Sequence, residues 1–467
     1  MRLPPKMLRR HEVMTGDTVS IIGLGKLGAS MAAAMASRGL KVIGVDVVPR
    51  AVELLNQGKP PVVETDLAEY ITRHRKNLEA TADYRHAVQN SDITFVIVPT
   101  PSDERGAFSI KYAISAFQSI GEALREKDGY HTIVLTSTVL PGSTRFGLLP
   151  VLEEASGKKC GKDFGLCYSP EFIALGSVIH DFLNPDFLLI GEFDKKSGDM
   201  LTGYYSRIME NNPPVKRMSI ENAELTKISL NSYVTMKITF ANMVSALCER
   251  IPGGDVDVVT DALGLDRRIG RRYLTGGLGF GGHCFPRDNI ALAFLARSLG
   301  VSHELLLATD HFNKNIPGEA VKKLGGLIKP GMTVGILGLS YKPLSCVVEE
   351  SQGILLAESL AAHDVKVLGY DPLAREEVVH KYLGKIEMVY SLQECIDSSD
   401  VVFITTPDPA FKDLRKEDFS RGRNPKVVVD FWRMLKGELE GGQVKYIQVG
   451  TGEMEGEALE NLENLWR

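Results

Sequence analysis

The sequence has little of what marks secreted, membrane-spanning or nucleic-acid-binding proteins. Its six cysteines form no CxxC pair and are too sparse for a disulfide framework, so we expect reduced thiols in a cytoplasmic protein. No run of apolar residues approaches membrane-spanning length, so no membrane partner is expected. A net charge of −5 gives no general attraction to nucleic acid.

The chain is long enough for more than one folded domain. Its 467 residues exceed what one hydrophobic core usually serves, and 44% hydrophobic with 24% charged residues is an ordinary globular composition. The histidines lack metal-ligand spacing, which predicts no metal site. Residues 1–16 carry positive charge without an apolar stretch, so we expect a loose arm rather than a secretory signal.

Two regions of strand and helix alternation flank a helical middle. In the first region, apolar runs alternate with helix-like stretches such as 110–126, which predicts a parallel sheet covered on both faces; the runs lie at 93–99, 132–138 and 187–191. After Pro213 and Pro214 the strand-like runs stop and a long helical pattern begins at 220. The helices are expected to end near Asn315, because Pro317 and Gly318 break the pattern.

Alternation of strands and helices returns in the last third of the chain. We therefore predict an α/β protein with two Rossmann-like, doubly wound domains joined by a central helical domain. The expected boundaries are 17–212 for the first α/β domain, 213–318 for the helical domain and 319–467 for the second α/β domain.

A GxGxxG motif follows the first strand-like run and opens a helix. Its backbone N–H groups and the helix N-terminus can receive a pyrophosphate, and an aspartate eighteen residues later (46 − 28) can bond a ribose diol. That acid favours NAD over NADP. The alternative is a tight turn without a ligand. The predicted cofactor-binding residues here are Gly23, Gly25, Lys26, Leu27, Gly28 and Asp46.

A glycine-dense loop at 276–282 ends on His283 and Cys284, with Arg287 and Asp288 close behind. A thiol at a loop-to-helix junction gains thiolate character from helix N–H groups and a nearby cation, which is typical of a reactive cysteine. His283 could raise that thiolate fraction or make a local hydrogen bond. The alternative for Cys284 is a buried, inert thiol.

Lys227 and Asn231 lie four residues apart in a helical pattern and therefore share one helix face. Both polar groups could point at one site. Spacing alone favours a solvated surface stripe instead.

In the order of its motifs the chain resembles the UDP-glucose/GDP-mannose dehydrogenases, from about Val19 to about Arg433. The similar stretches are the three motifs above together with VPTPSDERGAF, STVLPGSTR, SPEFIALGSVIHDFLNP, DRRIGRRYL and ILGLSYKP. The resemblance implies a long central helix, NAD on the first domain, the nucleotide of a sugar on the last, and a homodimer. It also implies oxidation of a sugar CH2OH to a carboxylate, with a cysteine holding the aldehyde and then a thioester.

Carried onto this sequence, the resemblance assigns roles residue by residue. Cys284 would be the nucleophile, Lys227 and Asn231 would stabilise the oxyanion, and Asp288 would orient water or accept a proton. Glu171 would assist thioester hydrolysis, unless it is a surface charge, and Thr138 would join the water network, unless it caps a helix. Thr100 and Thr138 would also contact NAD. The predicted substrate-binding residues are Glu171, Phe172, Lys227, Asn231, Arg268, Tyr273, Phe280, Gly281 and Lys342.

Arg268 resembles an arginine that reaches the substrate nucleotide across the dimer; outside that context it would be a solvated charge. Three positions depart from the family pattern. Leu175 replaces an acid, Glu349 stands where an arginine helps hold NAD, and Trp432 stands where an arginine contacts substrate. We expect these changes to reshape the pocket for a sugar other than plain glucose.

Two other functions stay open. One is a two-electron dehydrogenase on the same scaffold, which the presence of Cys284, Glu171 and Lys227 opposes. The other is a non-catalytic nucleotide-sugar binding protein, suggested by Leu175 and Glu349. The leading hypothesis is four-electron oxidation at C6 of a UDP-hexose, such as UDP-glucose or a UDP-N-acetylhexosamine, with GDP-mannose next.

Overall fold

The computed structural model of the chain describes residues 16–173, 175–382, 384–421, 426–439, 444–453 and 457–466. The predicted N-terminal arm, apart from Gly16, lies outside these residues. The chain divides into two compact units, Met1–Ile228 and Ser229–Arg467. Among the described residues, none of the helices combines the length and apolarity that crossing a bilayer requires.

The first unit is built on an eight-stranded sheet with the order β3-β2-β1-β4-β5-β6-β7-β8. The first six strands in this order are those of a dinucleotide-binding fold, with the strand order reversing between β1 and β4. The strands are β1 (Thr18–Ile22), β2 (Lys41–Val45), β3 (Leu78–Thr81), β4 (Ile93–Val96), β5 (Thr132–Leu135), β6 (Gly165–Tyr168), β7 (Leu188–Glu192) and β8 (Val215–Ser219).

The prediction of a parallel first sheet holds for the first six strands in this order and is wrong for the last two, β7 and β8, which run in the opposite direction. β7 pairs with β6 in the antiparallel sense, and β8 then pairs with β7 in parallel. Between β6 and β7 the chain forms a helix of six residues, α7 (Val178–Leu183), too short to cross the sheet face and return, so β7 starts from the edge where β6 ends. The strand β8, directly after Pro213 and Pro214, is also absent from the sequence prediction.

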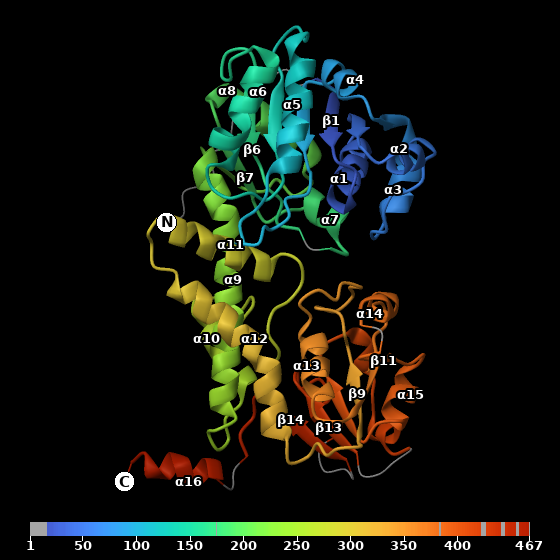
Figure 1. The fold of residues 1–467 in the computed structure, drawn as a ribbon, viewed down its shortest axis with the longest axis vertical. Helices are drawn as coiled ribbons and strands as arrows, with labels where there is room; N and C mark the ends of the chain where they lie inside the picture. Colours follow the sequence, from blue (N-terminus) through green and yellow to red (C-terminus); the bar gives the residue numbers. More distant parts are fainter. Residues whose placement is uncertain are drawn as a thin grey trace, which may run out of the picture. The chain divides into compact units, whose positions relative to one another are not determined.

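Helices cover both faces of this sheet (Figure 1). One core cluster joins the sheet to α1 (Lys26–Ser37), α2 (Pro49–Asn56), α3 (Leu67–His74), α7 and α8 (Lys195–Ile208). The other joins it to α4 (Tyr84–Gln89), α5 (Lys111–Arg125) and α6 (Leu149–Ser156). In α5 the buried residues Ala113, Phe117, Ile120 and Leu124 recur at helical spacing and form one apolar face.

A 29-residue helix, α9 (Ile220–Cys248), begins in the first unit and continues into the second. The helical region goes on with α10 (Val256–Leu265), α11 (Phe285–Ser298) and α12 (Glu304–Leu324). The expected helix end near Asn315 is wrong, because α12 continues through Pro317. A proline inside a helix removes one backbone hydrogen bond, and here α12 packs against α11 and α13. The domain boundaries at 213 and 318 stay predictions.

The second unit ends in a six-stranded parallel sheet with the order β11-β10-β9-β12-β13-β14, the same arrangement as the first six strands of the other sheet. Its strands are β9 (Thr333–Leu337), β10 (Lys366–Tyr370), β11 (Glu387–Met388), β12 (Val401–Ile404), β13 (Val427–Asp430) and β14 (Lys445–Gln448). Its helices are α13 (Gln352–Ala361), α14 (Arg375–Lys381), α15 (Leu392–Asp397) and α16 (Glu457–Asn464). The predicted architecture of two Rossmann-like domains and a central helical region is confirmed.

Candidate active site

The GxGxxG turn has the geometry that a dinucleotide needs. Gly23 has φ +99°, and a Cβ at Gly28 would collide with the carbonyl oxygen of Gly23. Gly25 is exposed and faces open space, next to the first turn of α1. Asp46 accepts hydrogen bonds from the backbone N–H groups of Leu24 (2.6 Å) and Val48 (2.8 Å). The turn therefore leaves backbone donors and a partly exposed carboxylate for a ligand, which fits NAD.

The remaining cofactor candidates lie in this turn or just after two neighbouring strands of the same sheet. Lys26 is exposed and opens α1, and Leu27 is half-buried in its first turn. Thr100 and Thr138 follow the adjacent strands β4 and β5, and the Thr100 hydroxyl donates to the Thr138 carbonyl at 2.7 Å. No helix begins at Thr138 among the described residues, so it is not a helix cap.

Lys227 and Glu171 meet in the first unit. The Lys227 ammonium donates to the Glu171 carbonyl oxygen at 2.6 Å and lies 4.6 Å from the centroid of the Phe172 ring. Burial raises the pKa of the Glu171 carboxyl to about 8, with Lys227 acting in the opposite direction. Lys227 is 8% exposed. Lys227 is therefore not part of a solvated surface stripe, and Glu171 is half-buried rather than fully exposed.

Asn231, one turn after Lys227 on α9, lies in the second unit. Its side-chain amide donates to the Asp288 carboxylate at 2.6 Å. Asn231 is 8% exposed and Asp288 1% exposed. A buried carboxylate needs hydrogen-bond donors, and the amide of Asn231 supplies one and fixes the orientation of Asp288. The two side chains therefore form an ordered, buried polar pair.

Cys284 lies at the N-terminus of α11 and is exposed, which excludes the alternative of a buried, inert thiol. Its carbonyl accepts the backbone N–H of Asp288 at 2.8 Å, which closes the first turn of the helix. The side chain of Tyr341 is close to Cys284, and a Cβ at Gly282 would contact its ring. Burial, followed by the charge of Cys284, raises the pKa of Tyr341 to about 12. An accessible thiol at a helix N-terminus is suited to act as a nucleophile.

Glu349, which stands where the family pattern has an arginine, has its negative charge balanced by neighbouring groups of the second unit. The Glu349 carboxylate forms an ion pair with Lys381 and lies 3.4 Å from Nε2 of His283. Burial alone would raise its pKa, but the hydrogen bond from Lys381 and the neighbouring His283 keep the pKa of Glu349 below its usual range. Glu349 therefore does not present an uncompensated negative charge.

Two of the aromatic substrate candidates, Tyr273 and Phe280, lie beside Phe285, the residue after Cys284. Phe285 makes edge-to-face contacts with Phe280 and Tyr273, at ring-centroid distances of 6.5 and 6.3 Å. Gly281 has no room for a side chain, because a Cβ there would strike the Glu350 carbonyl. Arg268 is not part of this group. It is highly exposed and pairs with Asp266 at 2.6 Å.

The last three residues singled out from the sequence lie in different settings. The Lys342 ammonium lies 5.7 Å from the centroid of the Tyr341 ring. Leu175 is partly buried in a turn. The Trp432 indole N–H donates to the Thr405 carbonyl at 2.9 Å, and a Cβ on Gly277 would lie 2.9 Å from its ring. Trp432 thus packs against the glycine loop.

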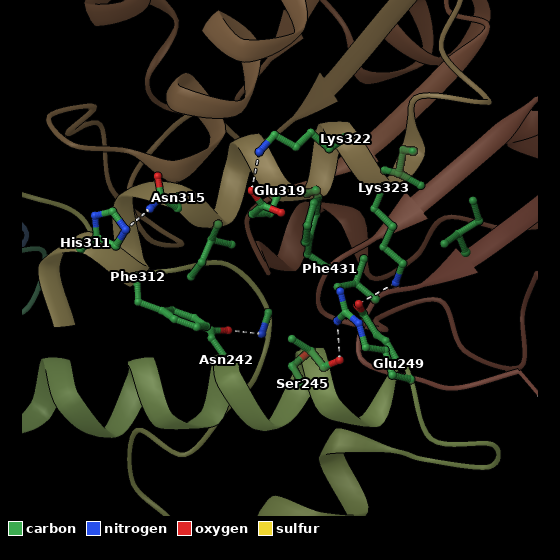
Figure 2. Close-up of a pocket in the computed structure, with 18 residues that line it drawn as sticks. Asn242, Ser245, Glu249, His311, Phe312, Asn315, Glu319, Lys322, Lys323 and Phe431 are labelled. Carbon is green, nitrogen blue, oxygen red and sulfur yellow. Dashed lines mark hydrogen bonds and ion pairs between the residues drawn. The ribbon is translucent and has the colours of Figure 1, made fainter. Parts of the chain in front are cut away.

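A separate cavity of about 690 Å³ lies in the second unit behind the glycine loop, between α9, α12 and the second sheet (Figure 2). Asn242, Gly277 and Phe431 are among its lining residues. Four of its charged groups form two ion pairs, Lys323 with Glu249 and Lys322 with Glu319. Cys284 and Asp288 are not among its lining residues, so this cavity is separate from the candidate active site.

Sequence patterns missed several residues that hold the site. Glu224 is buried and accepts the backbone N–H groups of Gly142 (2.6 Å) and Thr144 (2.9 Å), which fixes the segment after Thr138. Tyr341 lies inside the quoted ILGLSYKP motif, so the motif was the available signal. No local sequence pattern indicates that Lys381 pairs with Glu349, because the two residues are 32 positions apart in the chain.

Three family models match the chain along its length. They are the NAD binding domain (residues 17–209), the central domain (221–315) and the UDP binding domain (335–437) of the UDP-glucose/GDP-mannose dehydrogenase family. The first match agrees with the geometry of the glycine turn and of Asp46, so the cofactor of this chain is NAD.

Curated relatives and solved structures agree with these matches. A GDP-mannose 6-dehydrogenase of Pseudomonas aeruginosa is 37% identical over 412 residues, 85% of this chain and 93% of the relative. The UDP-glucose 6-dehydrogenase AglM of Haloferax volcanii is 34% identical and covers 89% of this chain and 97% of the relative. The structure of a UDP-glucose dehydrogenase from Pyrobaculum islandicum aligns with a TM-score of 0.84 at 32% identity, over 95% of this chain and 100% of that one. The chain therefore belongs to the UDP-glucose/GDP-mannose dehydrogenase family, whose members it matches in sequence, in domain order and in fold.

Proposed function

We propose that the chain oxidises the C6 hydroxymethyl group of a nucleotide sugar to a carboxylate in two successive steps, with Cys284 as covalent nucleophile. The observation that carries this proposal is the exposed Cys284 thiol at the start of α11, one turn before the buried Asp288–Asn231 pair. A two-electron dehydrogenase has no need of such a thiol, because its product leaves without a covalent intermediate.

The Gly23–Gly28 turn and Asp46 would hold NAD, which when bound would supply the hydride acceptor for each oxidation. In our proposal Cys284 adds to the C6 aldehyde formed first and holds it as a thiohemiacetal, whose oxidation gives a thioester. The negative charge that develops on the C6 oxygen would be stabilised by the ammonium of Lys227 and the amide of Asn231. Asp288, fixed by its hydrogen bond from Asn231, would orient water or take up a proton.

Glu171 completes the proposed mechanism. Water attack on the thioester needs a base. Burial raises the pKa of the Glu171 carboxyl to about 8, which is close to the pH at which enzymes usually work, so this carboxyl can take up a proton there. Thr138 would belong to the same water network. Phe172, Tyr273, Phe280, Gly281 and Lys342 would line the sugar and nucleotide pocket, and Arg268 would reach the nucleotide of the partner subunit.

UDP-hexoses, with UDP-glucose and the UDP-N-acetylhexosamines first, are the substrates that we propose, followed by GDP-mannose. The match to a UDP binding domain supports the uracil base. The test is a panel of UDP- and GDP-hexoses, including the N-acetyl forms, with NAD and purified protein, followed as NADH formation. A single preferred sugar supports the proposal and names the substrate. No turnover with any sugar contradicts it and favours a nucleotide-sugar binding protein.

A homodimer is part of the proposal. Tyr233, Phe240 and Leu247 are exposed on α9 and are spaced by seven residues, so they form one apolar stripe, and Leu265 at the end of α10 is 85% exposed. Light scattering should give twice the chain mass of 51.2 kDa. Phe240→Glu combined with Leu247→Glu should give a monomer, whereas Val63→Glu, at an even more exposed apolar residue of the first unit, should not. A monomeric wild type contradicts the dimer.

We also propose a cytoplasmic location. All six cysteines are free thiols, and three of them are buried. Unpaired thiols persist in a reducing compartment. Fractionation of cells that express the chain at its natural level should find it with cytosolic markers, and recovery outside the cell would contradict this.

A further inference from the structure

Arg433 joins the glycine loop to two other parts of the second unit. Its Nε and Nη2 donate to the carboxylate of Asp257 on α10, at 2.7 and 2.9 Å. Nη2 also donates to the carbonyl of Gly276, at 2.8 Å. Nη1 donates to the carbonyls of Phe431 and Val449, at 2.8 and 2.7 Å. One buried side chain, 5% exposed, thus connects α10, the end of the second sheet and the first residue of the loop.

The backbone conformation of Arg433 is strained. Its φ is +55°, in the left-handed region that a residue with a side chain rarely adopts. The five hydrogen bonds of the guanidinium hold the residue in this conformation. A buried, strained arginine bound in bidentate fashion by the half-exposed carboxylate of Asp257 is an arrangement that lysine cannot reproduce, because lysine lacks the planar set of donors.

Two asparagines hold the next residues of the loop. Asn242 of α9 accepts the backbone N–H of Gly277 (2.8 Å) and donates to the carbonyl of Leu278 (3.2 Å). Asn313 of α12 accepts the N–H of Phe280 (2.8 Å) and donates to its carbonyl (2.9 Å). Gly276 is the first residue of this loop, so the hydrogen bond from Arg433 to its carbonyl fixes where the loop that leads to Cys284 begins.

We propose that Arg433 is a positioning residue for the substrate loop, residues 276–284. By fixing the Gly276 carbonyl to the second sheet and to α10, it sets the place of Phe280 and Cys284 relative to the domain that binds the nucleotide. This inference rests on the proposed function for its kinetic consequence, but its structural consequence stands without it. Arg433 itself touches no substrate in this account.

The test compares Arg433→Gln with Lys323→Gln. Lys323 also joins two elements of the second unit, through its ion pair with Glu249, so its variant controls for the loss of a cross-element ionic contact. Arg433→Gln should speed amide hydrogen exchange in 276–284 by about tenfold or more, because it removes hydrogen bonds to a charged group. The nucleotide-sugar KM should rise by about tenfold, while the NAD KM stays within about twofold, since the NAD turn belongs to the other unit.

A purely structural role would accelerate exchange evenly through the second unit, or lower the melting temperature with both KM values unchanged, and either result overturns the proposal. Arg433→Lys keeps the charge, so its exchange rate in 276–284 and its nucleotide-sugar KM should lie between those of wild type and Arg433→Gln. This variant keeps the test decisive if the glutamine variant does not fold. If wild type oxidises no nucleotide sugar, the proposed function fails. The exchange comparison still decides whether Arg433 positions the loop.

Discussion

Gly23 after β1 and Gly338 after β9 occupy equivalent turns in the two sheets. Both have a left-handed backbone, with φ of +99° and +101°, and both donate their N–H to the last residue of the second strand, at 2.7 and 2.9 Å. In each turn a second glycine, Gly28 or Gly353, lies against the carbonyl of the first, where a Cβ would collide. The two α/β regions therefore share one local design.

The aspartate that follows each second strand is used differently. Asp46 accepts two backbone hydrogen bonds and is partly exposed, and a carboxylate has about four acceptor sites, so it keeps capacity for a ligand. Asp371 is 5% exposed and accepts four backbone hydrogen bonds, two to each oxygen. A glycine turn followed by an acid thus leaves carboxylate oxygens available for a ligand in the first sheet, whereas in the second the carboxylate is fully engaged by backbone N–H groups. The availability of the carboxylate, rather than the motif, separates the two.

The largest expected effect separates the first unit, with its glycine turn for NAD, from the second unit, with the proposed nucleophile Cys284. Cys284→Ser should lower turnover at least about a thousandfold, because a serine hydroxyl without an activating base is a poor nucleophile. NAD binding, measured by fluorescence titration, should be unchanged. Cys346→Ser is the matched control, since Cys346 is also an exposed thiol of the second unit. Equal turnover in the two variants would rule out covalent catalysis by Cys284.

Glu171 is the candidate general base of the first unit, and the effect of replacing it should depend on pH. Its pKa is raised to about 8, so the carboxylate forms as pH rises through 8, and wild-type turnover should rise over the same range. Glu171→Gln should lower turnover about a hundredfold and remove this rise, since general base catalysis is lost. Glu69→Gln, at an exposed acid, should leave the profile intact. An unchanged pH profile in Glu171→Gln would exclude the base role.

Asp371→Asn tests whether Asp371 stabilises the second sheet through its four backbone hydrogen bonds. The amide loses charge-assisted hydrogen bonds to four backbone N–H groups, so the free energy of unfolding should fall by about 2–3 kcal/mol. Chemical denaturation measures this change. NAD affinity should stay as in wild type, because the turn of the first sheet is untouched. A loss of NAD affinity without a loss of stability would reverse the roles given to the two aspartates.

Asp46→Asn is the counterpart and should give the smallest effect. NAD should bind about tenfold more weakly, since one charged hydrogen bond to the ribose is lost, and discrimination against NADP should narrow. The free energy of unfolding should change by less than about 1 kcal/mol. Isothermal titration with NAD and NADP, beside a denaturation curve, distinguishes this pattern from that of Asp371→Asn.

The sequence predicted the elements better than their connections. The helix expected at 110–126 is Lys111–Arg125, since apolar spacing reports the buried face directly. The direction of β7 was missed because periodicity is the same for either strand direction. The continuation of α12 through Pro317 was missed because tertiary packing can offset the one hydrogen bond that a proline removes.

The candidate site was predicted where its signals are local. The glycine turn with Asp46, the Cys284 loop and the spacing of Lys227 and Asn231 are all visible within a few residues. The sequence could not show that Glu349 is neutralised by Lys381, or that Arg433 bonds Gly276, 157 residues away. Contacts of that separation depend on the fold, and a single sequence contains no signal for them.

The most direct test of the account is the number of NADH molecules formed for each sugar consumed, measured with the preferred nucleotide sugar and the purified protein. Because Cys284 is expected to hold the aldehyde until it is oxidised again, the account predicts two NADH for each sugar and a uronic acid as product. One NADH for each sugar, with an aldehyde or ketone product, would contradict the covalent mechanism and make the chain a two-electron dehydrogenase.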